Sequence, residues 1–178
     1  MKLGAKVAIS GVISALAVVI MLFSFFPTLE IGIPALAGLL MVILVVEMDW
    51  KWGFMGYLTV SFIAFLLAPS LESRLLFICF FGYYPVIKAL IERIRLKLLM
   101  WLIKFACFNM AAVFVYWLLL TVTTAVDRDS FTVFGVYLPG VILLLGNIVF
   151  LVYDFALIRI ISTYIHIWQP RLHRWLHF

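Results

Sequence analysis

The stretch Leu75–Leu90, LLFICFFGYYPVIKAL, decides how the rest of the sequence is interpreted. It is a hydrophobic run whose second half contains Gly82 and Pro85, which predict a bend in a helix. The densest basic cluster of the chain lies at its end and just beyond. Its members are Lys88, Arg93, Arg95, Lys97 and Lys104. A basic loop after an apolar segment indicates the inner side of a membrane.

The composition supports a membrane environment for the whole chain. Of the 178 residues, 67% are hydrophobic and 12% are charged, whereas a soluble domain is roughly half apolar and a quarter charged. The length fits one helical bundle without a second domain. The net charge of +5 comes from basic residues that flank hydrophobic runs, a pattern that indicates topology and not nucleic-acid binding.

Six hydrophobic segments predict an all-α, polytopic membrane protein with six transmembrane helices. They cover residues 7–26, 33–47, 54–68, 75–91, 98–125 and 134–161. At about 1.5 Å per residue, the second and third segments are short for a bilayer core about 30 Å thick. The flanking Trp50, Trp52 and Tyr57 suit the membrane interface.

The basic residues predict the orientation of this bundle. Six spans place both termini on one side, and eleven basic residues fall on that side against two on the other. The eleven are Lys2, Lys6, Lys51, Lys88, Arg93, Arg95, Lys97, Lys104, Arg159, Arg171 and Arg174, and the two are Arg74 and Arg128. The positive-inside rule therefore predicts cytoplasmic termini in a multi-pass protein of the cell membrane.

The first helix carries a stripe of small residues. Gly4, Ala8, Gly11 and Ala15 are spaced by four, three and four positions, which places them on one helical face. Small residues allow close approach of helices in lipid. The stripe either packs inside the bundle or docks another membrane protein.

Three polar residues of the last two segments need partners inside the membrane. Asn109 is expected to join two helices by a hydrogen bond. A charge inside a span is usually paired, and Asp154 and Lys104 lie at similar depths, so we expect a structural ion pair between them.

The inner segment 88–104 alternates apolar and basic residues, which predicts an amphipathic helix on the inner membrane surface. It either binds anionic lipid or provides a landing site for a partner. Residues 168–178 predict a second interfacial helix. This tail contains His173 and His177, but no carboxylate or Cys accompanies them there, so we expect no metal site.

The outer loops supply candidate ligand contacts. Residues 27–34, PTLEIGIP, form either a solvated turn or a ligand-gating loop. The next outer turn can cap a helix through Ser70 or Ser73. Arg74 either meets an anionic ligand or pairs with Glu72 or a lipid phosphate. A pocket open to the outside would be lined by residues in the outer half of the helices, with a polar residue at its bottom. These candidates are Glu30, Gly32, Arg74, Tyr116, Trp117, Thr121 and, as the floor, Asn147.

The sequence motifs of common catalytic sites are missing, which argues against an enzyme. The spans hold no paired acids, no zinc-binding HExxH and no GxSxG nucleophile elbow, and the chain has no GxxxxGK[ST] phosphate loop. We therefore expect no catalytic site, no cofactor and no ATP binding by this chain itself. Ionisable residues at mid-bilayer and inverted repeats, which are typical of ion-coupled transporters, are not evident either.

With six spans, about 180 residues and a small-residue first helix, the chain resembles the substrate-binding S-components of energy-coupling factor vitamin transporters. The resemblance implies an outward pocket for a vitamin or similar solute. It also implies docking of a membrane coupling protein on Gly4, Ala8, Gly11 and Ala15, with energy from two separate ATPases. The chain also resembles the rod-shape-determining membrane subunit of the bacterial elongation machinery, which would make it a scaffold of a cell-wall complex.

Overall fold

A computed structural model describes residues 3–122, 132–133 and 136–168. The chain forms a helical bundle. Its elements are α1 (Leu3–Leu22), the short turns η1 (Phe23–Phe25) and η2 (Pro27–Leu29), α2 (Gly32–Glu47), α3 (Trp50–Leu67), α4 (Leu71–Leu76), η3 (Phe77–Phe81), α5 (Tyr84–Ile91), α6 (Lys97–Val122), β1 (Thr132–Val133), β2 (Val136–Tyr137), α7 (Leu138–Thr163) and η5 (Tyr164–Trp168). The two strands form a two-residue antiparallel ladder between α6 and α7.

The described residues contain five helical segments long and apolar enough to cross a membrane, and one shorter apolar helix. The shorter one is α2, with 16 residues, or about 24 Å of helix. Each predicted segment therefore contains a helix, but the sixth begins too early, because Val136–Tyr137 form β2 and α7 starts at Leu138. The predicted third segment gains a turn at its start because the Asp49 carboxylate accepts a hydrogen bond from the Trp50 amide at 2.7 Å and caps α3.

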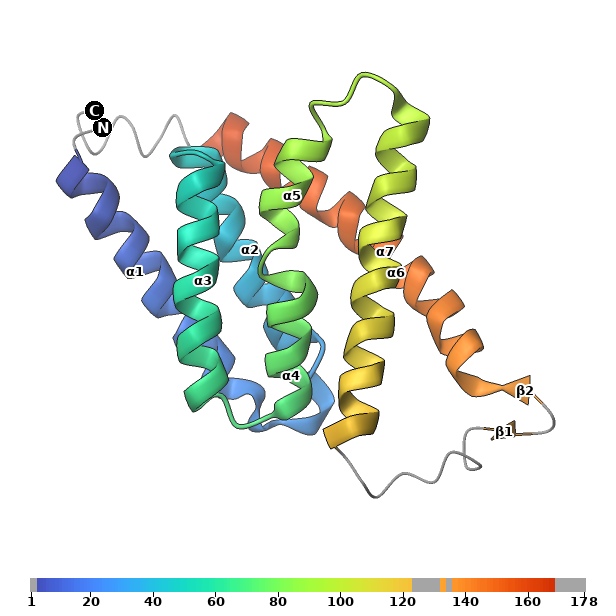
Figure 1. Ribbon diagram of the computed structural model, residues 1–178. Coiled ribbons are helices and arrows are strands. Elements are labelled where there is room, and N and C mark those ends of the chain that lie inside the picture. The colour runs from blue at the N-terminus through green and yellow to red at the C-terminus, as the bar shows by residue number, and fades with distance from the viewer. Residues whose placement is uncertain (1–2, 123–131, 134–135, 169–178) are drawn as a thin grey trace.

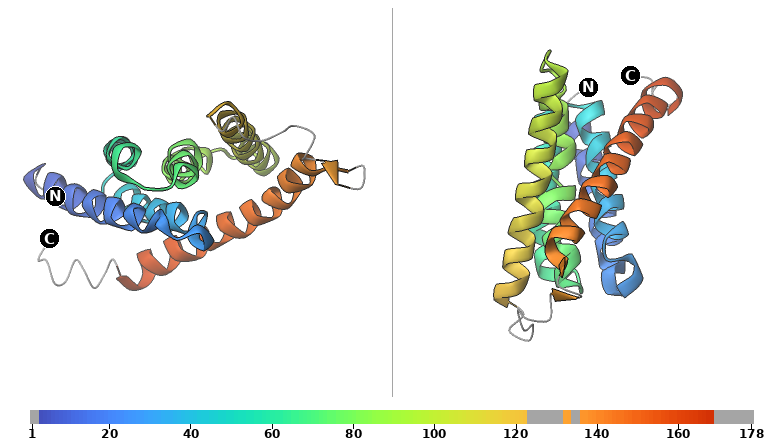
Figure 2. Two further views of the ribbon diagram at one scale, coloured as in Figure 1. Left: turned by 90° about the horizontal axis from the view of Figure 1, so that it is seen from below. Right: turned by 90° about the vertical axis from the view of Figure 1, so that its right-hand side faces the viewer.

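The helices are arranged in two layers (Figures 1 and 2). One layer contains α1, α2 and the tilted α7, and the other contains α3, the α4–α5 segment and α6. The start of α1 and the end of α7 lie at the same end of the bundle as the α5–α6 connection, which we call the basic end (Figure 1). The α1–α2 and α3–α4 connections, the end of α6 and the start of α7 lie at the opposite end.

The segment around Gly82 and Pro85 is interrupted, as predicted. It runs as α4, then a π-helical turn over Phe77–Phe81, then α5 with Pro85 in its first turn. Gly38 of α2 packs directly against this turn, since a Cβ atom on Gly38 would collide with the backbone carbonyl of Phe81. The irregular backbone is therefore held inside the bundle, where neighbouring helices shield it from lipid.

The core is built from apolar residues of both layers. Its largest fully buried apolar members are Tyr84, Phe77, Phe150, Met21, Met41, Leu44 and Leu157. Much of the remaining surface is apolar too, including Phe62, Met110 and Leu144. Exposed apolar surface on this scale suits a protein whose solvent is lipid.

The prediction of one amphipathic helix over 88–104 is wrong. Lys88 belongs to α5, which ends at Ile91, and α6 begins at Lys97. The side chains of Lys88 and Lys104 are buried instead of lying on the membrane surface. The reason is that acidic partners from two helices meet them inside the bundle, as described below.

Candidate functional site

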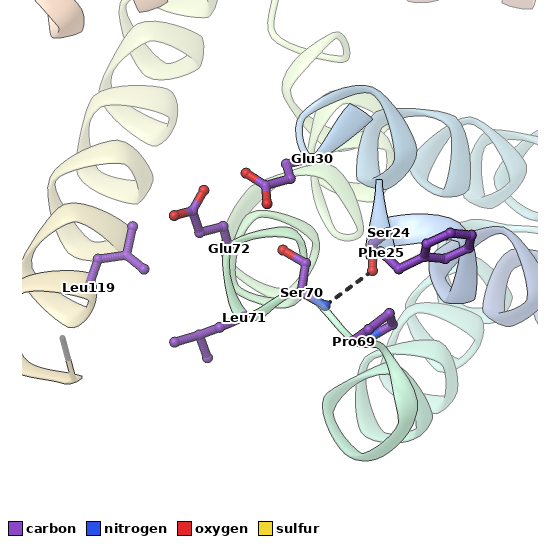
Figure 3. A pocket seen from close by; sticks show the side chains of 8 residues that line it. All are labelled: Ser24, Phe25, Glu30, Pro69, Ser70, Leu71, Glu72 and Leu119. Atoms are coloured by element: carbon purple, nitrogen blue, oxygen red, sulfur yellow. Dashed lines mark hydrogen bonds between the residues drawn. The ribbon is translucent and has the colours of Figure 1, made fainter. Parts of the chain in front are cut away.

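A pocket of about 490 Å³ opens at the end of the bundle opposite the basic end. It lies where the α1–α2 connection, the α3–α4 turn and α6 approach one another (Figure 3). Its lining consists of Ser24, Phe25, Glu30, Pro69, Ser70, Leu71, Glu72 and Leu119. We call it the outer pocket.

Serine hydrogen bonds fix the walls of the outer pocket. Ser70, one of the two serines that the sequence suggested, is the N-cap of α4, and its Oγ accepts from the Ser73 amide at 3.3 Å. Ser73 Oγ donates to the Glu30 carbonyl at 2.9 Å. The Ser70 amide donates to Ser24 Oγ at 3.4 Å. These bonds tie the α1–α2 connection to the start of α4, although the two are more than forty residues apart.

Two carboxylates provide the charge of the outer pocket. The Glu30 and Glu72 side chains point into the same space, with Leu119 of α6 across from them (Figure 3). Phe25 and Leu119 add apolar surface. The combination suits a small solute that presents hydrogen-bond donors to the carboxylates and an apolar part to the rest.

The structure does not gather the predicted ligand residues into one cavity. Of the seven, Glu30 lines the outer pocket. Gly32 is exposed at the start of α2. On α6, Tyr116 is half-buried and Thr121 is exposed. Trp117 lies in a separate, nearly apolar hollow on α6 with Asn109, Met110, Val113 and Phe114.

Arg74 is not part of the lining of the outer pocket, and its side chain binds backbone instead. Its guanidinium donates to the carbonyls of Phe65 at 3.0 Å, Ser70 at 3.2 Å and Pro69 at 3.4 Å. Within the residues that the structure describes, it forms no ion pair with Glu72. Arg74 therefore satisfies carbonyls at the end of α3 and in the following turn.

Asn147, the predicted pocket floor, pairs with Asn109. Each amide nitrogen donates to the other side chain's oxygen, at 2.9 and 3.0 Å. Each also donates to the carbonyl four residues earlier in its own helix. The prediction that Asn109 joins two helices is confirmed, and its partner is Asn147.

A buried ionic network lies nearer the basic end. Tyr84 and Lys88 of α5 and Glu92, the residue that caps its end, follow one another at intervals of four residues on one helical face. Lys104 of α6 and Asp154 of α7 complete the set. Lys88, Lys104 and Asp154 are essentially inaccessible, at 1%, 1% and 0% exposure, whereas the Glu92 side chain is 38% exposed. We call these five residues the ionic network.

Asp154 is the centre of the ionic network. Its Oδ1 accepts from Lys88 Nζ at 2.5 Å and from the Tyr84 hydroxyl at 2.6 Å, and its Oδ2 accepts from Lys104 Nζ at 2.9 Å. Glu92 Oε1 lies 2.7 Å from Lys88 Nζ and 3.0 Å from Lys104 Nζ. The predicted Asp154–Lys104 pair is confirmed, and it belongs to a larger set.

The network joins three helices and balances its own charge. Two ammonium groups face two carboxylates, the buried Asp154 and the partly exposed Glu92, so the four charges of the network balance. An aromatic cluster that includes Phe80, Phe108, Phe150 and Tyr153 packs around its mid-bundle side. Desolvated charges with complete hydrogen bonding hold helices in a defined arrangement. The sequence analysis missed Tyr84, Lys88 and Glu92, although their spacing marks one helical face.

The small-residue stripe of α1 faces away from the bundle. Gly4, Ala8, Gly11 and Ala15 are all exposed. A Cβ atom on Gly4 or Gly11 would meet nothing within 4 Å. The buried residues of α1 are Ser14, Ala17 and Met21 on the other face. Internal packing, the first of the two interpretations of the stripe, is therefore wrong.

Comparison with known proteins found no matching family model, curated protein or solved structure.

The predicted interfacial helix over 168–178 lies outside the described residues in all of its length beyond Trp168. His173, His177 and the outer Arg128 lie outside them as well.

Proposed function

We propose that this protein is a membrane subunit that binds a small solute, such as a vitamin, and delivers it to a separate coupling protein driven by ATPase subunits. In this proposal six helices cross the plasma membrane of a bacterium and both termini are cytoplasmic. The chain itself carries out no catalysis and needs no cofactor. The outer pocket holds the solute, and the stripe of α1 docks the coupling protein.

The distribution of charge supports this orientation. Arg93, Arg95 and Lys97 lie in or beside the α5–α6 connection, at the basic end. Glu30 and Glu72 lie at the opposite end in the outer pocket. The positive-inside rule places the basic end in the cytoplasm. With 16 residues, α2 is shorter than an average transmembrane helix. It packs against both α1 and α3, and a short helix can cross the membrane where the bilayer is locally thinner.

The exposed stripe of α1 is the observation that carries the proposal. A run of small residues on a membrane helix allows another helix to approach closely. The bundle makes no use of this face, because Ser14, Ala17 and Met21 provide the packing of α1. A docked helix would turn the stripe into an interface, as the resemblance to S-components implies.

The docking test replaces Gly11 and Ala15 by Leu. There is room for both side chains in the isolated protein, since both residues are exposed and nothing lies near Gly11. We expect the variant to fold normally and to lose co-purification with a coupling protein expressed beside it. Gly140→Leu is the matched control, because Gly140 of α7 is also exposed and open. Undiminished association of the double variant would contradict the docking role.

The solute test measures thermal stabilisation of the purified protein by a panel of vitamins and precursors. A ligand at a hundred times its dissociation constant stabilises by roughly 2.7 kcal/mol. A true solute should lose this effect in Glu30→Gln or Glu72→Gln, while Trp117→Ala should respond normally because Trp117 lies outside the outer pocket. Failure of both the docking and the solute tests would favour the alternative, a scaffold of a cell-shape complex.

A further inference from the structure

The α5–α6 connection is a second exposed charged region, distinct from the stripe and the outer pocket. Arg93, Arg95 and Lys97 are all exposed. Their side chains form no ion pair or hydrogen bond within the part of the chain that the structure describes. Lys88 and Lys104, the other cations of this region, are neutralised inside the ionic network. Three uncompensated positive charges therefore remain within five residues.

Apolar side chains project beside these charges. Leu96 is 67% exposed and Leu98 is 81% exposed. Both follow the turn in which the Arg93 amide donates to the Leu90 carbonyl and the Ile94 amide to the Ile91 carbonyl. A short, hydrogen-bonded connection thus presents cations and leucines together. Such a surface fits a molecule with an anionic group next to a hydrocarbon chain.

Tryptophans indicate the depth of this connection in the membrane. Trp101 lies one turn into α6, and Trp50 and Trp52 lie in the first turn of α3 at the same end of the bundle. Tryptophan side chains concentrate at the level of lipid headgroups. The connection lies just beyond that level, where basic residues meet the phosphates of the inner leaflet.

We propose that Arg93, Arg95, Lys97, Leu96 and Leu98 form a binding surface for anionic phospholipid. The cations contact the headgroup phosphate and the leucines insert beside the acyl chains. The first amides of α6 lack helical acceptors, as at any helix start, and their orientation adds to the attraction for an anion. The surface is independent of the proposed solute pocket and of the α1 stripe.

The test measures retention of phosphatidylglycerol by the purified full chain, by native mass spectrometry, against phosphatidylcholine. The variant is Arg93→Gln/Arg95→Gln/Lys97→Gln. A basic residue near an anionic surface contributes about 1 kcal/mol, or roughly fivefold in affinity. We therefore expect the triple variant to bind phosphatidylglycerol at least tenfold more weakly, with phosphatidylcholine binding unchanged.

The control is Lys6→Gln/Lys51→Gln/Arg159→Gln, which removes three cations from other parts of the basic half. It should retain phosphatidylglycerol within about twofold of the unmodified protein. An equal loss in both triple variants would show diffuse charge attraction and overturn the proposal. Unchanged retention of phosphatidylglycerol by the Arg93→Gln/Arg95→Gln/Lys97→Gln variant would also overturn the proposal, even if that variant no longer bound a partner protein.

Two further experiments distinguish a lipid-binding surface from a simple anion site. Leu96→Ser/Leu98→Ser should weaken phosphatidylglycerol retention several-fold with the charges intact. Inorganic phosphate at equal ionic strength should not displace the lipid, because it lacks the acyl chains. Displacement by phosphate, together with no effect of the serine variant, would identify a simple anion site and refute a lipid surface. Normal thermal unfolding of each variant confirms that the bundle is intact.

Discussion

The carboxylate of Asp154 accepts a hydrogen bond from the Lys104 ammonium at 2.9 Å, although fifty residues separate the two in the sequence. The same carboxylate also accepts from Lys88 and Tyr84. One buried acid on α7 thereby holds both α5 and α6. The stability of the bundle should depend on Asp154 more strongly than on any exposed charge.

Replacing Asp154 by Ala should lower the free energy of unfolding by about 3–5 kcal/mol, since it leaves two buried ammonium groups facing one carboxylate. Thermal or denaturant unfolding in detergent would measure the loss. The paired variant Asp154→Ala/Lys104→Met leaves Lys88 balanced by Glu92, and should recover much of it. No difference between the single and paired variants would show that charge balance is unimportant.

Asn109→Leu should destabilise the protein by roughly 1 kcal/mol, because the Asn147 amide loses its partner on the neighbouring helix. The double variant Asn109→Leu/Asn147→Leu removes both polar groups and should be at least as stable as the single one. A double-mutant cycle of unfolding free energies gives the coupling between the two amides. Purely additive effects would contradict a direct pair.

Gly38→Ala should destabilise the bundle by about 1–3 kcal/mol, the range for overpacking. The added Cβ atom meets the Phe81 carbonyl, which belongs to the backbone and cannot rotate aside. Gly32→Ala is the matched control in the same helix, where nothing lies within 4 Å. It should be neutral or stabilising, because Ala favours the helix. Similar melting temperatures for both variants would refute the close contact.

Arg74→Gln should destabilise the protein by about 1–3 kcal/mol without any solute present, because carbonyls of Phe65, Pro69 and Ser70 lose a charged donor. Arg95→Gln is the comparison, since the Arg95 side chain is exposed, and exposed substitutions usually stay within 0.5 kcal/mol. If Arg74→Gln altered solute affinity and left unfolding unchanged, a ligand role would replace the structural one.

The sequence by itself determined the helical segments, and it predicts the membrane side of each charge. A 67% hydrophobic composition and apolar runs leave helices as the structure that satisfies the backbone in lipid. Local signals also narrowed the cap of α4 to Ser70 or Ser73 and predicted the interruption at Gly82 and Pro85. Each of these features depends on residues close together in the chain.

Only the tertiary structure decided which side chains meet. The sequence predicted one surface helix over 88–104, but Lys88 and Lys104 lie in two different helices. Both lysines are buried because they pair with Asp154 of α7. The tertiary structure placed Glu72 beside Glu30 and moved Arg74 onto backbone carbonyls. It also left the α1 stripe exposed. In lipid an apolar residue is stable facing either the bundle or the bilayer, so hydrophobicity marks the span but not the packed face.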